Sequence, residues 1–175
     1  TNYANQIDSI ITLGDTYSSE LAFEGISNII FENGPEPQST AWYVKPGGSG
    51  NQDGTSWHNA FATRQEAVNA ASAGEHIRVM AGTYHIKTVQ IPKLGVSEYY
   101  GFAPTSGTWE TRNPWLHTSV LDAGYTANRW DNIGVVFTLD QIIDGLCVKN
   151  VIGGSGIVSM QAGTFRNVSA VNCTG

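Results

Sequence analysis

The sequence predicts an all-β chain, and within that class a parallel β-helix with about 22 residues per coil. A large apolar residue recurs at a constant interval, at Ile77, Tyr99, Leu121, Ile143 and Phe165. The surrounding residues are rich in Val, Ile, Thr and Gly, which disfavours a helical hairpin, and the 20 glycines in the chain favour tight corners. A repeat of this size is typical of one coil that stacks on the next.

Other positions repeat with the same spacing. We expect Asn150 and Asn172 to form an asparagine ladder at a turn, and Val148 to lie over Ala170 in the interior. The two cysteines, Cys147 and Cys173, are four places out of register, so we expect free thiols rather than a disulfide.

Composition excludes several classes of function. The chain is 41% hydrophobic and 14% charged, which predicts a folded protein with a core. Its net charge of −6 argues against nucleic-acid binding and against unaided binding of acidic polysaccharides. No apolar run reaches the ~20 residues of a membrane span, so we expect no membrane insertion. The chain opens without a signal peptide, so an exported protein would have lost its leader already.

Three segments are predicted along the chain. Residues 1–34 hold two apolar stretches and form either an extra coil or the strands of a preceding domain. Residues 35–41 are a Pro-containing linker, and residues 42–175 form the capped β-helix, which we expect to be incomplete at its C-terminal end.

The start of the third segment carries a helix signal. A short strand at 42–44 and a glycine-rich loop precede Thr63 and Glu66, which have the spacing of a capping box, and Gly74 marks a stop. The helix should have an apolar side, and we expect it to cover the open end of the β-stack.

These motifs also carry a family resemblance. The stretch AWYVKPGGSGNQDGTSWHNAFATRQEAVNAASAGEHIRVMAGTY, followed by GVSEYYGFAP and SVLDAG, resembles the right-handed parallel β-helix proteins of the pectate lyase-like superfamily. The likeness covers residues 42–175 and is greatest to bacterial secreted and surface proteins, adhesin-like ones included. It implies the architecture rather than one activity, because such proteins include lyases, glycoside hydrolases and adhesins.

A metal site has one candidate pair. Asp122 and Asp144 are one predicted coil apart, so they should stack and could share a calcium ion. Arg166 is next in register, and the alternative is a simple charge ladder at a corner. We expect no cofactor on balance, with calcium kept as the alternative.

Two loops, 103–117 and 124–132, are rich in aromatic and polar residues and should project from one side. They could form an aromatic shelf on which sugar rings stack. The candidate substrate-binding residues are Trp109, Arg112, Trp115, Tyr125, Arg129 and Trp130. The alternative is that the tryptophans pack under the loops.

Glu98 is a further question, since strand alternation places it with Val96 and Tyr100 on one face. Either a shifted register turns it outward, which we favour, or it is a carboxylate with a raised pKa at a site.

The expected function is an exported surface or adhesion-type module that could hold a glycan or another cell-surface ligand. The alternatives are a fragment of a polysaccharide lyase or glycoside hydrolase, and a structural subunit completed by another chain at its C-terminal end. An enzyme would need basic residues clustered with carboxylates on one sheet, and residues 77–175 show no such cluster. We therefore favour a non-enzyme and name no catalytic residue.

Overall fold

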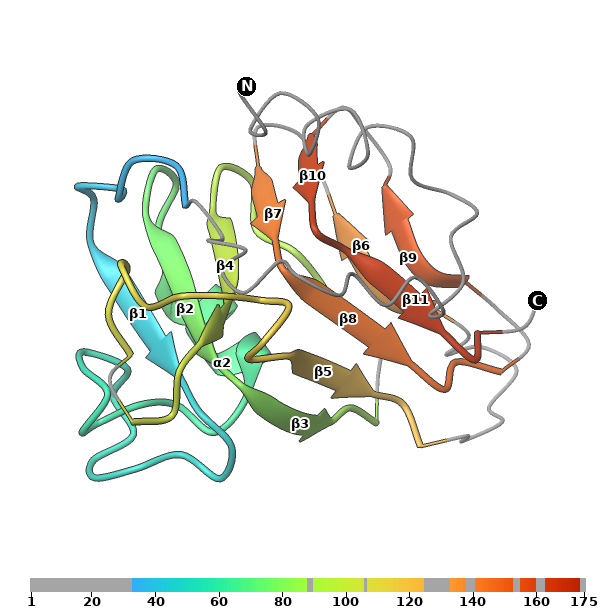
Figure 1. Cartoon of the computed structure of the whole chain (residues 1–175), viewed down its shortest axis with the longest axis horizontal. Coiled ribbons are helices and arrows are strands. Elements are labelled where there is room, and N and C mark those ends of the chain that lie inside the picture. The colour runs from blue at the N-terminus through green and yellow to red at the C-terminus, as the bar shows by residue number, and fades with distance from the viewer. Residues whose placement is uncertain are drawn as a thin grey trace, which may run out of the picture. The chain divides into compact units, whose positions relative to one another are not determined.

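Figure 1 shows the computed structural model of the chain. It describes residues 33–87, 90–105, 107–124, 133–137, 141–152, 155–159 and 163–173. All of these belong to one unit, Asn33–Gly175.

The strands pair in parallel and divide among three sheets. The five-stranded sheet consists, in spatial order, of β1 (Ala41–Val44), β2 (His76–Met80), β4 (Ser97–Phe102), β7 (Ile142–Asp144) and β10 (Thr164–Arg166). The four-stranded sheet consists of β11 (Ser169–Val171), β8 (Leu146–Lys149), β5 (Ser119–Asp122) and β3 (Gly82–His85). The third sheet pairs β6 (Ile133–Phe137) with β9 (Ser155–Ser159).

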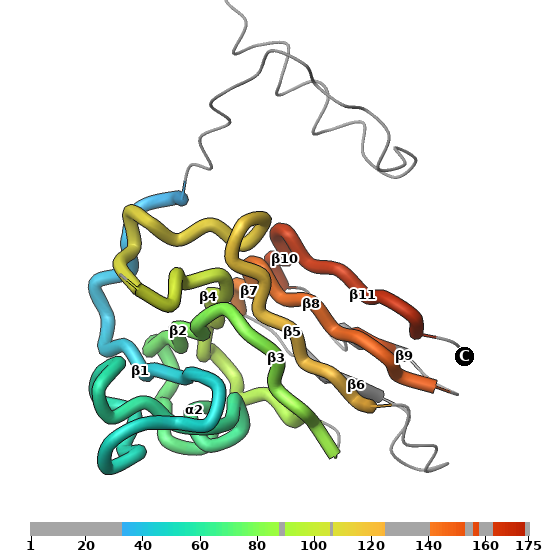
Figure 2. The backbone as a smooth tube through the Cα atoms, turned by 60° about the horizontal axis from the view of Figure 1, so that its bottom comes forward, coloured from blue at the N-terminus to red at the C-terminus, as the bar shows by residue number. Residues whose placement is uncertain are grey.

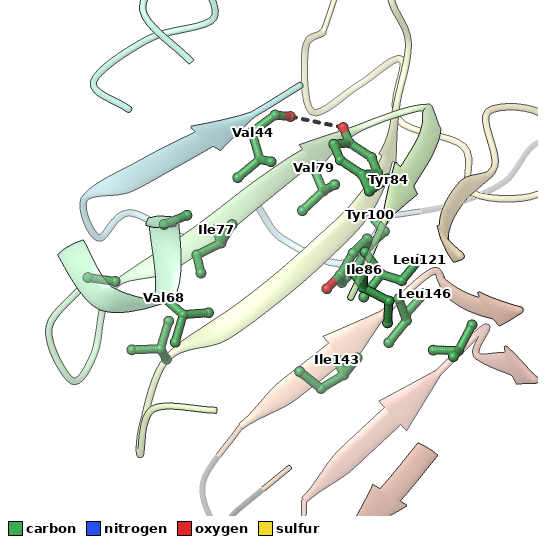
Figure 3. Close-up of a cluster of buried hydrophobic side chains, with 14 of the residues drawn as sticks. Val44, Val68, Ile77, Val79, Tyr84, Ile86, Tyr100, Leu121, Ile143 and Leu146 are labelled. Atoms are coloured by element: carbon green, nitrogen blue, oxygen red, sulfur yellow. Dashed lines mark hydrogen bonds between the residues drawn. The ribbon is translucent and has the colours of Figure 1, made fainter. Parts of the chain in front are cut away.

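The hydrophobic core is shared by the two larger sheets and the helix α2 (Arg64–Ala70) (Figure 3). Alternation along each strand directs one set of side chains to this core. In β2, for example, Ile77 and Val79 are buried in it. Across the core, Tyr84 of β3 donates hydrogen bonds through its hydroxyl to the carbonyls of Val44 and Met80, so the two sheets are also joined by polar contacts.

The predicted capping box is confirmed. Thr63 is the N-cap, its hydroxyl accepts from the Glu66 N–H, and the Glu66 carboxylate accepts from the Thr63 N–H at 2.9 Å. The helix ends at Ala70, before Gly74, and its buried Ala67 and Val68 pack in the core.

The glycine-rich loop, rather than the helix, supplies backbone hydrogen bonds to the outer edge of β1. The Tyr43 N–H donates to the Gly54 carbonyl, and the Phe61 N–H donates to the Tyr43 carbonyl, both at 2.9 Å. The Lys45 N–H in turn donates to the Phe61 carbonyl at 3.1 Å. Polar backbone groups at this edge are therefore satisfied within the chain.

The predicted right-handed β-helix with a constant coil length is wrong. The strands form separate open sheets, and across the described ranges no closed or solenoid sheet is seen (Figures 1 and 2). The predicted column breaks because Leu121 lies in the four-stranded sheet, between Tyr84 and Val148, whereas Ile143 lies in the five-stranded one. Along the five-stranded sheet, Ile77 pairs with Glu98 and not with Tyr99.

The physical reason for the broken column is that the connections between paired strands differ in length. From β2 to β10 of the five-stranded sheet the successive partners are positions 77, 98, 143 and 165, so the middle interval is about twice as long as the other two. In the four-stranded sheet the successive partners are positions 84, 121, 148 and 170, and the interval shortens at each step. The predicted period therefore describes only the last pairing of each sheet.

Those last pairings confirm the expected neighbours. Ile143 pairs with Phe165 and Val148 pairs with Ala170. The expected interior position is wrong for Ala170, which is exposed in β11, whereas Val148 is buried. The asparagine ladder is also present, since the Asn172 amide donates to the Asn150 side-chain oxygen at 3.4 Å. Both asparagines have positive φ, a conformation that asparagine tolerates better than most residues.

Candidate functional site

The loop that joins β4 to β5, residues 103–118, crosses the outer face of the five-stranded sheet; it is the yellow segment that passes in front of β2 and β4 in Figure 1. We call it the β4–β5 loop. It approaches the sheet closely because two glycines lie beneath Pro114. A Cβ atom at Gly101 would come within 2.5 Å of the Pro114 Cα, and one at Gly145 within 2.6 Å of its Cβ. Only glycine fits beneath the loop at these two places.

Gly101 also changes the direction of the next side chain. The β2–β4 register shifts between Val79 and Met80, and Gly101 has φ +93°, so β4 is irregular here. Tyr100 faces the main core, whereas Phe102 joins a second cluster with Tyr99 and Trp109 on the other face. This second cluster supports the β4–β5 loop.

Arg112 anchors the loop to the sheet. Its side chain is buried, and its Nη2 donates to the Asp144 carbonyl at 2.8 Å and lies 3.1 Å from the Asp144 carboxylate. Its guanidinium also lies 5.6–5.9 Å from the ring centroids of the second cluster. Burial lowers the pKa of Arg112, although the neighbouring Asp144 opposes the change.

Trp109 packs beneath the loop. The residue is 7% exposed, and its ring meets Tyr99 edge-on at 4.9 Å between centroids. Its indole N–H donates to the Gly34 carbonyl at 2.8 Å, and the guanidinium groups of Arg78 and Arg112 lie over the ring at 5.7 and 5.6 Å. A ring so enclosed offers no face to a sugar, so the packing alternative describes Trp109.

Trp115 has the opposite environment. Trp115 and Leu116 are each 73% exposed. The Asn113 side-chain oxygen accepts from the N–H groups of both residues, at 3.0 and 3.1 Å, and the Asn113 N–H donates to the Gly101 carbonyl. Asparagine commonly fixes turns in this way. The backbone that carries the exposed indole is therefore held by defined hydrogen bonds.

The structure thus separates the six predicted site residues. Trp109 and Arg112 lie together in the interior, and Trp115 lies on the surface of the same loop. Tyr125, Arg129 and Trp130 lie outside the described residues. The role of Trp115 in binding stays a prediction.

Most of the predicted linker, residues 35–41, forms part of this region. With the two residues before it, it makes up residues 33–40, which we call the strap and which side chains hold to the five-stranded sheet. Glu36 accepts from Arg78 of β2 at 2.6 Å, and the Ser39 hydroxyl lies 3.0 Å from the His76 Nδ1. The alternation of β2, which places Ile77 in the core, could have indicated that His76 and Arg78 face outward. Nothing in the strap's sequence indicated its contact with them.

Among the titratable groups of this contact, His76 has the largest change in pKa. Burial, and then the charge of Arg78, lower its pKa to about 4. The Arg78 Nε–H donates to the His76 Nε2 at 3.0 Å, which requires that nitrogen to be unprotonated. His76 is therefore neutral at pH 7 and acts as a hydrogen-bonding residue.

Glu98 is buried, so the expected outward register is wrong. Arg64 of α2 reaches it with Nε at 2.7 Å and Nη2 at 2.5 Å from the two carboxylate oxygens. The Tyr100 hydroxyl donates to the same carboxylate at 2.6 Å. The negative charge is thus balanced by a cation inside the core, a structural arrangement that has no access to solvent.

The predicted stacking of Asp122 and Asp144, on which the calcium alternative rested, is also wrong, because the two residues lie in different sheets. Asp122 accepts from the Asn150 amide and the Gly124 N–H, whereas Asp144 contacts Arg112 and the Asn167 amide. Among the side chains that the structure describes, no group of three His, Cys, Asp or Glu residues has the arrangement of a metal site.

Comparisons with models of protein families, with curated proteins and with solved structures found no match to this chain. The resemblance to the pectate lyase-like superfamily therefore stays a prediction from the motifs quoted above. Over the ranges described, no helix has the length and apolar character that a membrane span requires.

Proposed function

We propose that the chain is a non-catalytic, exported binding module of the surface or adhesion type, and that the β4–β5 loop contacts a neutral glycan through Trp115. The observation that carries the proposal is the combination of a tryptophan residue that is 73% exposed with a backbone fixed by Asn113. An exposed ring on an ordered backbone loses little conformational freedom on binding. It offers a flat apolar face of the kind against which sugar rings stack.

The charge of the chain favours a neutral ligand. A net charge of −6 opposes polyuronates, sulfated glycans and nucleic acids at long range. Stacking on an indole needs no opposite charge, and Glu110 and Thr111 on the same loop are exposed polar groups that suit sugar hydroxyls.

The pairing of the buried and partly buried charges supports binding over catalysis. Arg64 pairs with Glu98, Arg78 with Glu36 and Arg112 with Asp144. A general acid or base must reach its substrate. Groups committed to such pairs stabilise the fold, so the lyase or hydrolase alternative receives less support from this region.

The test is a glycan array followed by calorimetric titration of any glycan that binds. We expect Trp115→Ala to abolish detectable binding and Leu116→Ala to leave the affinity within about twofold, because only the ring can stack. Leu116 is the matched control, since it is the equally exposed neighbour. Equal affinities for wild type and Trp115→Ala would reject the proposed contact.

Activity is tested separately on pectin, alginate and neutral polysaccharides, with and without calcium. We expect neither unsaturated product, measured by absorbance, nor new reducing ends. Release of either product would favour the enzyme alternative instead.

A further inference from the structure

Asn33 connects the strap to the β4–β5 loop through three hydrogen bonds. Its side-chain amide donates to the carbonyl of Trp109 at 2.7 Å and to that of Arg112 at 2.9 Å. Its side-chain oxygen accepts from the Arg112 Nη1 at 2.6 Å. One side chain therefore satisfies two carbonyls of the loop and one donor of the loop's anchor.

The strap is itself fixed by further contacts that follow Asn33. The Gly34 carbonyl accepts from the Trp109 indole, and Glu36 accepts from Arg78. Arg112, which Asn33 contacts, also donates a hydrogen bond to the Asp144 carbonyl in β7. Strap, loop and sheet thus form one connected set of polar contacts, and Trp115 follows Arg112 closely in the chain.

We propose that Asn33 is a positioning residue for ligand binding: it holds the β4–β5 loop in the conformation that presents Trp115, so affinity at Trp115 depends on attachment of the strap. This inference rests on the proposed function. Asn33 itself touches no ligand. Without its amide, two partly buried carbonyls each lose one donor, although the Trp109 carbonyl still accepts from the Arg112 N–H, and Arg112 loses one acceptor. These losses favour opening of the loop. A loop that must be ordered upon binding binds more weakly.

The experiment compares Asn33→Ala and Asn33→Asp with Gln38→Ala in the whole chain. Asn33→Asp keeps the shape and the acceptor for Arg112 but removes both donors to the loop carbonyls. Gln38 is the matched control, since its amide donates only within the strap, to the Glu36 carbonyl at 3.0 Å. Each variant is titrated with the glycan found for the wild type. Amide hydrogen exchange is measured for residues 107–118 and for core strand β2, and the Trp115 indole signal, assigned with Trp115→Phe, is followed by NMR.

We expect both Asn33 variants to bind about tenfold more weakly or worse, to exchange loop amides faster and to broaden the Trp115 indole signal, while β2 keeps its protection. Gln38→Ala should match the wild type in all three measurements. Unchanged loop exchange in the Asn33 variants would overturn the inference, as would unchanged affinity with a loosened loop.

The two proposals fail separately. If Trp115→Ala binds like the wild type, the glycan contact is rejected whatever Asn33 does. If Trp115→Ala loses binding and the Asn33 variants do not, the contact stands and the positioning role is rejected. If Asn33→Ala also lowers the hydrogen-exchange protection of β2, the test of the positioning role rests on Asn33→Asp, because this variant preserves the bond to Arg112.

Discussion

At the scale of single residues, buried charged side chains in the described part of the chain lie beside partners that balance their charge. Glu98 lies in the middle of the apolar core and meets Arg64 and Tyr100 there. Burial lowers the pKa of Arg64, but Glu98 and Tyr100 together outweigh burial and raise this pKa above its usual value. Burial, together with Glu98, raises the pKa of Tyr100. Arg64 therefore stays charged and Tyr100 stays neutral at pH 7.

A buried ion pair contributes little compared with an apolar pair but is costly to break. We expect Glu98→Leu to lower the free energy of unfolding by about 3–5 kcal/mol, because it leaves the Arg64 cation buried and uncompensated. The double variant Arg64→Met/Glu98→Leu should recover most of this loss. Urea denaturation followed by circular dichroism measures both, with the exposed Glu110→Gln as control. A single variant as stable as the wild type would show that Arg64 finds solvent when Glu98 is absent.

The lowered pKa of His76 predicts that the stability of the fold depends on pH. Its neighbours are Ser39 and Glu36 of the strap, Arg78 of its own strand and Glu75, and its ring also meets Tyr99 edge-on at 5.9 Å. Its pKa is about 4 in the folded chain and about 6.5 when unfolded, so between these values the unfolded chain binds more protons. Stability should therefore fall as the pH is lowered from 6.5 to 4, by at most about 3 kcal/mol from this group, and the loss is complete below pH 4.

The measurement is urea denaturation at half-unit steps between pH 4 and 7. His76→Gln should flatten the curve across this window relative to the wild type. His58→Gln, at an exposed position in the segment before α2, should not. Parallel curves for wild type and His76→Gln would contradict the assignment.

At the scale of elements, Gly101 decides where the β4–β5 loop lies. Gly101→Ala faces both an unfavourable φ of +93° and a contact of 2.5 Å with the Pro114 backbone. Gly74→Ala is a matched control, since Gly74 has φ +88° with open space around it. We expect Gly74→Ala to cost about 1 kcal/mol and Gly101→Ala about 2–4 kcal/mol of unfolding free energy. Only Gly101→Ala should shift the Trp115 indole signal, and equal costs would show that Pro114 moves away freely.

The elements also show which features the sequence can predict. The capping box of α2 depends on Thr63 and Glu66 alone. The pairings of Ile143 with Phe165 and of Val148 with Ala170 each join two strands that are one predicted coil apart in the sequence. Such local signals are confirmed. The predicted column failed at Leu121 because the β4–β5 loop lengthens the connection and moves the next strand to the other sheet.

The site was predictable only in part, for a related reason. Composition indicated an aromatic loop, but not that Trp109 is enclosed and Trp115 exposed. Their difference depends on Gly101, Arg112 and Asn33, of which Asn33 is 76 residues away from Trp109 along the chain. Side-chain contacts of this range leave no periodic signal in one sequence.

At the scale of the whole described unit, the core is contributed by both larger sheets and α2, while the last strands are much more exposed. Val44, Ile77 and Leu121 are fully buried, whereas β10 and β11 carry largely exposed side chains. Regions with little buried apolar surface open at lower free energy than the core. We therefore expect the unit to open from the β10 and β11 side.

The two thiols report on this difference. Both are free; Cys147 is buried in β8, and Cys173, after β11, is half-buried with its Sγ 3.5 Å from the Val171 carbonyl. Measured in the variants Cys147→Ser and Cys173→Ser, the remaining thiol of Cys173 should react with an aromatic disulfide reagent at least about 100-fold faster than that of Cys147. Reaction of Cys147 should accelerate with urea as global unfolding does, whereas reaction of Cys173 should depend weakly on urea, because local opening exposes little surface. Equal rates with equal urea dependence would show that both larger sheets open as one cooperative unit.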